Sequence, residues 1–119
     1  MKPTLDIKNF DKHIHTSLLN RAKEEKVGHV HIFDTSKCKG GLTVAFRQSG
    51  RFKTGRMVDV AVATCSIEDT FSRKIGANIA LRNFFEGNTI SLPLLLGYDV
   101  SNINYAVKAA FTRLYLDQF

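Results

Sequence analysis

Two apolar runs in the middle of the chain constrain its fold more than any other feature. Residues 41–47 (GLTVAFR) and 57–65 (MVDVAVATC) are rich in β-branched side chains, which favour strands. The segment between them, QSGRFKTGR, contains two glycines and suits a hairpin with a moderately long loop. Polar and apolar side chains alternate over 29–35 (HVHIFDT), as in a half-buried strand. The sequence therefore predicts an antiparallel sheet.

Helices are predicted before and after these strands. Residues 18–26 (LLNRAKEEK) are good helix formers, and Gly28 can end that short helix. The stretch CSIEDTFSRKIGANIALRNFFEGN, residues 65–88, predicts a longer helix. In this stretch Ser66 can act as the N-cap, with Asp69 in the place of the reciprocal acid three residues later.

The last part of the chain predicts one more strand and one more helix. Gly87 is placed to end the helix that precedes them. Residues 89–98 (TISLPLLLGY) indicate a buried strand or extended segment, and Pro93 excludes a central position in the sheet. Ser101 or Asn102 can cap the last helix, whose inward side would carry Ile103, Val107, Phe111 and Leu114 or Tyr115.

The chain of 119 residues is expected to form one domain, residues 1–119, around a single hydrophobic core. Strands followed by helices, without a regular βαβ alternation, predict the α+β class. The expected architecture is a mainly antiparallel sheet followed by two helices packed on one face, with a short N-terminal helix.

The expected compartment is the cytoplasm. No apolar stretch approaches the ~20 residues of a membrane-spanning helix, and the N-terminus MKPTLDIKNFDKHIH has no apolar core of signal-peptide length. Cys38 and Cys65 have no metal-type spacing and are too few for a disulfide framework, so reduced thiols are the simpler interpretation. We therefore expect a soluble, intracellular protein.

The net charge of +6 favours a negatively charged partner. It arises from 17 lysines and arginines against 11 aspartates and glutamates, which are spread over most of the length. Nucleic acid, a nucleotide or an acidic protein would suit such a chain. A basic domain without such a partner is the ordinary alternative.

Four histidines form two closely spaced pairs, His13 with His15 and His29 with His31. Residues two apart on a strand point to the same face, so each pair could offer two imidazoles to one metal ion. No Cys-x-x-Cys or His-Glu-x-x-His motif accompanies them. Surface or interface histidines are therefore the preferred interpretation, and no metal or cofactor is expected.

The sequence contains no recognisable catalytic motif. Cys65 lies near the predicted helix start, where a thiolate is favoured, yet no histidine can be nominated as its base. A small buried residue at the end of a strand is the better interpretation of Cys65. We therefore expect that the protein is not an enzyme.

Positive charges cluster near the predicted hairpin loop and the predicted helix. The loop and its borders carry Arg47, Arg51, Lys53 and Arg56, and the second turn of the helix carries Arg73 and Lys74. If the loop folds toward the helix start, these charges converge on one anion site beside free backbone N–H groups. The alternative, of equal weight, is that Glu68 and Asp69 pair with the cations and leave a solvated face.

The end of the same helix carries Phe84, Phe85 and Asn88. Two adjacent phenylalanines cannot face the core equally, so one ring is available to stack on a base or to pack against another subunit. Core packing is the ordinary alternative for either ring, and the Asn88 amide could read a nucleobase edge. Arg113 lies among apolar neighbours of the last helix, where it can snorkel, pair with Asp117 or reach a phosphate.

The phrase VAVATCSIEDTFSRKIGANIALRNFFEGN after a basic hairpin, with YAVKAAFTRLYLDQF at the end, resembles the Thoeris anti-defence proteins of the first type. The resemblance covers about the last two-thirds of the chain. It implies a phage protein with an antiparallel sheet followed by two helices, which forms dimers or larger oligomers. It also implies binding of cyclic ADP-ribose isomers and related cyclic nucleotides without degradation, so that a bacterial immune effector is not activated. The four histidines have no part in it.

Together, the resemblance and the cationic and aromatic residues predict a non-catalytic protein that sequesters a small phosphate-bearing cyclic nucleotide of the cyclic ADP-ribose type. It would counteract bacterial anti-phage immunity in the host cytoplasm, as a homodimer or higher homo-oligomer and without a membrane. The alternatives are a basic nucleic-acid-binding protein and a phage inhibitor that binds a host protein. The residues nominated for ligand binding are Arg56, Arg73, Lys74, Phe84, Phe85, Asn88 and Arg113.

Overall fold

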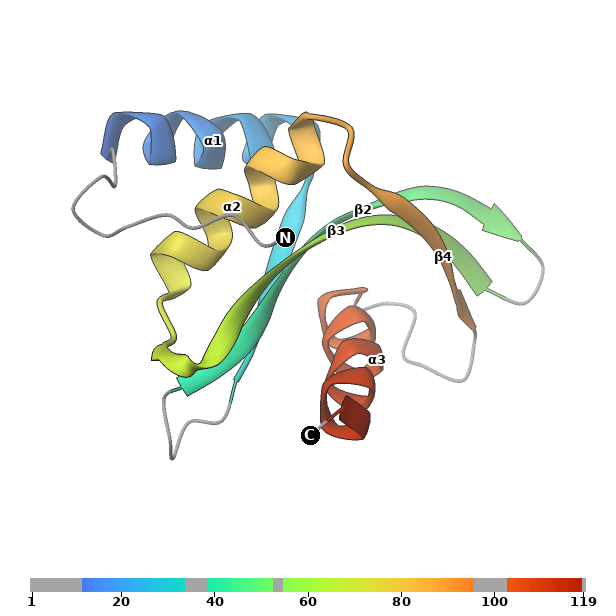
Figure 1. Cartoon of the computed structure of the whole chain (residues 1–119). Coiled ribbons are helices and arrows are strands. Elements are labelled where there is room, and N and C mark those ends of the chain that lie inside the picture. Colours follow the sequence, from blue (N-terminus) through green and yellow to red (C-terminus); the bar gives the residue numbers. More distant parts are fainter. Residues whose placement is uncertain (1–11, 34–38, 53–54, 96–102, 119) are drawn as a thin grey trace.

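The computed structural model describes residues 12–33, 39–52, 55–95 and 103–118, which form three helices and a four-stranded sheet (Figure 1). In chain order the elements are α1 (Lys12–Glu25), β1 (Gly28–Ile32), β2 (Lys39–Phe52), β3 (Gly55–Thr70), α2 (Arg73–Phe85), β4 (Ile90–Leu95) and α3 (Ile103–Gln118).

The sheet is an antiparallel meander with the strand order β1-β2-β3-β4. The long strands β2 and β3 form its centre as a hairpin, and β1 and β4 lie at its edges. β1 pairs with residues 42–46 of β2, whereas β4 pairs with residues 55–60 of β3, nearer to the hairpin end. Figure 1 shows that this hairpin end extends away from α1 and α2.

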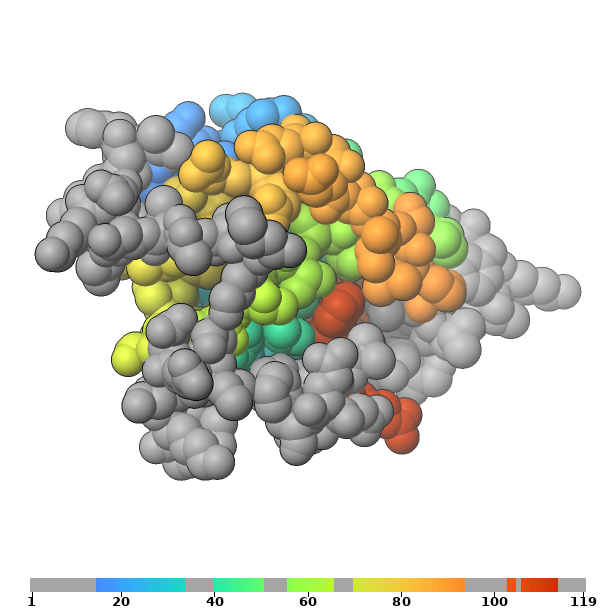
Figure 2. All heavy atoms as spheres, in the orientation of Figure 1, coloured from blue at the N-terminus to red at the C-terminus, as the bar shows by residue number. Residues whose placement is uncertain are grey.

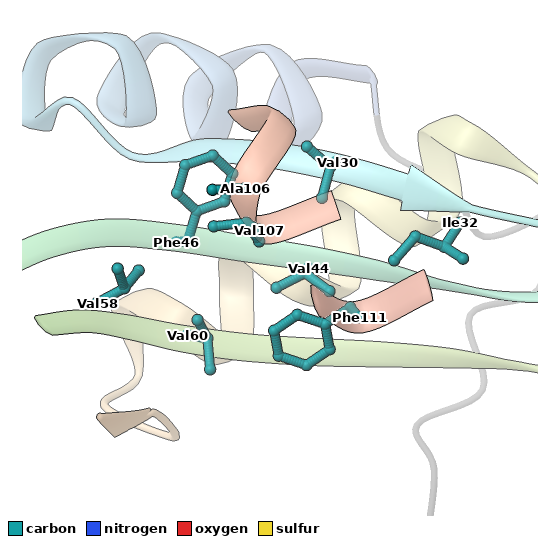
Figure 3. Close-up of a cluster of buried hydrophobic side chains, with 9 residues drawn as sticks. All are labelled: Val30, Ile32, Val44, Phe46, Val58, Val60, Ala106, Val107 and Phe111. Atoms are coloured by element: carbon teal, nitrogen blue, oxygen red, sulfur yellow. The ribbon is translucent and has the colours of Figure 1, made fainter. Parts of the chain in front are cut away.

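Helices cover both faces of the sheet (Figure 1). α1 and α2 pack on one face, in an apolar cluster that includes Ala22 of α1, Ala45 of β2 and Leu81 of α2. α3 packs on the other face (Figure 3). There its residues Ala106, Val107 and Phe111 meet side chains from three strands, namely Val30, Ile32, Val44, Phe46, Val58 and Val60.

The α+β class and the mainly antiparallel sheet are confirmed, but the packing of both long helices on one face is wrong. The reason lies in β2, where Val44, Ala45 and Phe46 are all buried although successive side chains point to opposite faces. A strand that is apolar on both sides needs a cover on each, because burial of apolar surface contributes about 25 cal/mol per Å². α2 and α3 supply these two covers.

Small side chains line the face beneath α1 and α2. Ala45, Ala61 and Ala63 belong to the apolar cluster on that face and are buried. α2 presents Gly76 at this contact, and a Cβ added there would overlap the hydroxyl group of Thr43. The glycine therefore allows α2 to lie close to the sheet.

The start of α2 differs from the prediction. β3 continues through Ser66 to Thr70, so the N-cap is Ser72 and not Ser66. Ser72 Oγ accepts a hydrogen bond from the backbone N–H of Ile75 at 3.3 Å. Strand pairing explains the shift, because Lys39 of β2 still pairs with Thr70 and holds this segment in the sheet.

The later helix start changes the place of several predicted features. Asp69 lies in β3 and is not the reciprocal acid of a capping box. Arg73 and Lys74 are the first two residues of α2 and do not lie in its second turn. Cys65 lies within β3 and not beside a helix start.

α1 is longer than the predicted helix, residues 18–26, and begins at Lys12. Lys26, with a φ of +59°, turns the chain at the end of the helix, so Gly28 is not the stop. Gly28 begins β1, where a Cβ would lie 2.8 Å from the ring carbon Cζ of Phe46 on the neighbouring strand. The glycine is therefore required for close strand packing.

The hairpin between β2 and β3 is tighter than predicted. β2 runs to Phe52 and β3 begins at Gly55, so residues 53 and 54 alone separate them, and these lie outside the described residues. The pairing of Phe52 with Gly55 extends the sheet through most of the segment that was predicted as a loop.

The later elements agree with the sequence. Gly87 has a φ of +83° and ends α2, and Pro93 lies in the edge strand β4 opposite Met57. The inward side of α3 includes Ile103, Val107 and Phe111, as predicted. The proposed caps of α3, Ser101 and Asn102, fall outside the described residues. No helix in the described ranges is long and apolar enough to cross a membrane.

We expect Gly76→Ala to lower the free energy of unfolding by about 1–3 kcal/mol, because the added methyl group would overlap Thr43 in a closely packed contact. This loss would occur although alanine is the better helix former. Urea denaturation measures it. Gly50→Ala is the matched control, since a Cβ at Gly50 meets only Met57 Cβ at 3.9 Å. Equal losses in the two variants would contradict the close contact.

Candidate functional site

The residues nominated from the sequence lie in four parts of the structure. These parts are the start of α2, the end of α2, the hairpin end of β3 and the exposed side of α3. The start of α2 holds Arg73 and Lys74. Its end holds Phe84 and Phe85, and Asn88 follows shortly after. The hairpin end of β3 holds Arg56, and the exposed side of α3 holds Arg113.

The lengths of the elements keep these parts separate. Positions 73 and 84 lie at opposite ends of α2, about 16 Å apart along the axis at 1.5 Å per residue. Arg56 and Thr70 lie near opposite ends of β3, about 45 Å apart along the strand. Arg113 is exposed on α3, which covers the other face of the sheet. One chain therefore does not bring the nominated residues into a single pocket.

At the end of α2 each phenylalanine contacts an arginine. The guanidinium carbon of Arg47, on β2, lies 5.3 Å from the ring centre of Phe84, and that of Arg21, on α1, lies 4.1 Å from the ring centre of Phe85. Glu25 pairs with both arginines, at 2.6 Å from Arg21 Nε and 3.5 Å from Arg47 Nη1. The two rings meet edge to face at 5.7 Å. The contacts join α1, β2 and α2.

The two phenylalanines have different environments. Phe84 is 6% exposed and belongs to the core beneath α2, whereas Phe85 is half-buried beside Arg21. Asn88 is exposed after the end of the helix. The end of α2 and β4 form adjoining surface (orange in Figure 2). The rings nominated to stack on a base are thus engaged in packing and in cation–π contacts.

A different group of side chains gathers at the start of α2. The guanidinium carbon of Arg73 lies 5.3 Å from the ring centre of Phe33, directly after β1. Phe33 stacks on Phe71 at 4.5 Å with an interplanar angle of 9°. Phe71 in turn meets His31 edge to face at 5.7 Å. A cation, two rings and an imidazole therefore follow one another across the junction of β1 and α2.

Two further histidines, His29 and His15, extend this group. His29 and His31 share one side of β1, as predicted, and their ring centres lie 5.3 Å apart. His31 Nδ1 is hydrogen-bonded to Thr43 Oγ1 on β2 at 2.9 Å. His15, on α1, lies close enough to His29 and to Lys74 for their charges to interact. Side chains of α1, α2, β1 and β2 therefore contribute to this group.

The other predicted histidine pair is not a strand pair. His13 and His15 lie on α1, where residues two apart point to different sides of the helix. The side chain of His13 lies outside the described residues. Within residues 12–33, 39–52, 55–95 and 103–118, no three or more His, Cys, Asp or Glu side chains are grouped so as to hold a metal ion.

The environment of His31 keeps its imidazole neutral. Burial, followed by the nearby charges of His29, Arg73 and Lys108, lowers the pKa of His31 from 6.5 to about 4. At pH 7 the ring is therefore an uncharged hydrogen-bonding group between Thr43 and Phe71.

Arg73 and Lys74 are the cations of this group that remain exposed. Neither forms an ion pair with any residue that the structure describes. The side chains of Glu68 and Asp69, the acids considered as their partners, lie outside the described residues. Since the first turn of a helix also has backbone N–H groups without an intrahelical acceptor, this position is suited to an anion.

Sequence reasoning nominated Arg73 and Lys74 but missed the aromatic and imidazole groups beside them. His29, His31 and Phe33 are spaced two apart, so Phe33, directly after β1, continues the side of the strand that carries the two histidines. This spacing was the signal in the sequence that could have identified Phe33. Comparison with protein-family models, with curated proteins and with solved structures gave no match for this chain.

We expect the free energy of unfolding to fall as the pH is lowered from about 6.5 to about 4. In this window the unfolded chain binds a proton at His31 that the folded protein does not bind, so stability rises with pH. His31→Asn keeps a side chain that can bond to Thr43 and should reduce the slope of stability against pH. Urea denaturation over this range measures the slope, and an unchanged slope would count against a neutral His31.

Phe84→Ala should lower the free energy of unfolding by about 3–5 kcal/mol, because a buried ring is removed from the core. Phe85→Ala, the same change at the neighbouring position, should cost less, since this ring is only half-buried. Chemical denaturation of both variants tests the difference. Equal losses would show that the two rings contribute alike.

Proposed function

We propose that the chain binds a small phosphate-bearing ligand at the start of α2 and holds it without chemical change. The observation that carries this proposal is the position of Arg73 and Lys74, two exposed cations in the first turn of a helix. Positive charge and free backbone N–H groups at a helix start both favour an anion there.

The surroundings of this position support phosphate binding further. His29 and His31 present imidazole groups from β1, and Phe33 and Phe71 form an apolar stack beside Arg73. Guanidinium, ammonium and imidazole groups all donate hydrogen bonds, and a phosphate oxygen accepts them. A bound phosphate would therefore meet donors from two separate elements, α2 and β1.

The same surroundings support binding without catalysis. Thr43 Oγ1 is hydrogen-bonded to a histidine ring, which is the arrangement of a nucleophile with its base. However, the Thr43 side chain is buried beneath Gly76 and cannot approach a bound ligand. The pairing of Thr43 with His31 is thus structural, and bond cleavage is not assigned to it.

The class of ligand in this proposal comes from the sequence resemblance. A cyclic nucleotide of the cyclic ADP-ribose type carries a diphosphate, which two adjacent cations can neutralise. Sequestration of such a signal would keep a bacterial immune effector inactive. The proposed biological role is therefore an anti-defence protein of a phage.

A homo-oligomer is part of the proposal, because it is the way in which the remaining nominated cations could take part. Arg56 lies at the hairpin end of β3 and Arg113 lies on α3, which packs on the other face of the sheet, so we propose that they reach the ligand from a second copy. Native mass spectrometry gives the number of subunits and of retained ligands together.

We expect Arg73→Gln with Lys74→Gln to weaken binding of cyclic ADP-ribose at least tenfold for each charge removed, since hydrogen bonds to charged groups contribute roughly 1.5–3 kcal/mol each. Isothermal titration calorimetry measures the affinity, and mass spectrometry of the recovered ligand tests whether it is intact. Recovery of a hydrolysed ligand would contradict sequestration and would indicate catalysis.

Controls separate this site from the alternatives. Lys23→Gln with Arg82→Gln removes the same charge from exposed positions elsewhere and should leave binding unchanged. If Phe85→Ala with Arg113→Ala abolishes binding while the changes at Arg73 and Lys74 do not, the ligand lies elsewhere. Binding of DNA or RNA that weakens steeply with salt, in the absence of nucleotide binding, would favour a nucleic-acid partner.

A further inference from the structure

The cations at the start of α2 lie beside imidazoles that can take up protons. We propose that the phosphate-bearing ligand is bound together with protons taken up by His29 and His31, so that the protein holds the ligand more tightly as the pH falls. This inference rests on the proposed function, because it concerns the regulation of the same site.

The geometry places these imidazoles within reach of the charges that would hold the ligand. The rings of His29 and His31 are 5.3 Å apart on one side of β1. Arg73 lies over the ring of Phe33 at 5.3 Å, Phe33 stacks on Phe71 at 4.5 Å, and Phe71 meets His31 edge to face at 5.7 Å. Arg73, two aromatic rings and two imidazoles therefore form one connected group at the junction of β1 and α2.

All the charged groups that act on these imidazoles in the described part of the chain are cationic when protonated. They are His15 of α1, His29 of β1, Arg73 and Lys74 of α2, and Lys108 of α3, which packs on the other face of the sheet. Burial first, and then these neighbours, lower the pKa of each histidine, to about 4 for His31. Protonation in the absence of an anion would add charge to an already positive group.

A bound phosphate reverses this balance. Its negative charge favours the imidazolium form and raises the pKa of a neighbouring histidine. An imidazolium also donates hydrogen bonds from both ring nitrogens, whereas a neutral imidazole donates from one. Protons are therefore taken up on binding wherever the pH lies between the pKa of the free protein and that of the complex.

One buried polar side chain of α2, Asn78, has an oxygen without a hydrogen-bond partner among the described residues. Its side chain is 2% exposed, and its Oδ1 has no hydrogen-bond partner among the residues that the structure describes. Asn78 follows Lys74 by one helical turn and therefore shares the side of α2 on which Lys74 approaches His15. Buried acceptors are normally paired, so this oxygen is an unused acceptor on that side of α2.

The test is isothermal titration calorimetry with ADP-ribose as the probe, since its diphosphate ester keeps a constant charge near neutral pH. Titrations in buffers with different enthalpies of ionisation give the number of protons taken up per ligand. We expect net uptake below pH 7 and an affinity that rises by up to about tenfold per pH unit for each proton. His29→Gln with His31→Gln should bind with an affinity that no longer changes with pH.

The outcomes separate this inference from the proposed function. Binding with no proton uptake at any pH would overturn the inference and leave the anion site in place. Absence of binding of both ADP-ribose and cyclic ADP-ribose by the unaltered protein would overturn both. Arg82→Gln, at the far end of α2, is the control and should keep the proton uptake of the unaltered protein.

A second measurement does not depend on the folding of the histidine variants. The ring protons of His29 and His31 can be followed by NMR during pH titration of the unaltered protein, with and without ADP-ribose. We expect the midpoint of titration of both rings to move to higher pH when the probe is bound. Identical titration curves would overturn the inference.

Discussion

The central strands β2 and β3 are apolar on both sides, and the remaining structure depends on this property. Val44 and Ala45 are consecutive, point to opposite faces and are both fully buried, so each face of the sheet needs its own helical cover. The side with alanines receives α1 and α2, and Gly76 allows α2 to come close enough to touch Thr43. That close approach brings the start of α2 to the histidines of β1.

The two ends of α2 use their positive charges differently. At the end of the helix, Arg21 and Arg47 are shared between Glu25 and two phenylalanine rings, so their charge is satisfied within the protein. The described chain holds three cation–π pairs, more than the one per about 70–80 residues that is usual. At the start of the helix Arg73 and Lys74 are exposed and pair with no acid among the described residues, although Arg73 also contacts the ring of Phe33. This difference is the reason for proposing an anion at the start of α2.

Local signals were sufficient for some elements and misleading for others. Ser66 and Ser72 are both acceptable N-caps by sequence, and the pairing of β3 with β2 decided for Ser72. His29 and His31 were correctly expected on one side of a strand, because alternation is a property of the strand itself. The approach of Arg73 to this strand was not predictable, since it depends on how closely a distant helix packs.

The sequence by itself determined the α+β class, the edge position of β4, the end of α2 at Gly87 and the inward side of α3. These features follow from the missing N–H of Pro93, from the conformational freedom of glycine and from the period of a helix, all of which act within a few residues. Only the tertiary structure decided which face each helix covers and which charges meet. Those outcomes depend on contacts between segments far apart in the chain, where the burial of apolar surface on both sides of the sheet outweighs local preference.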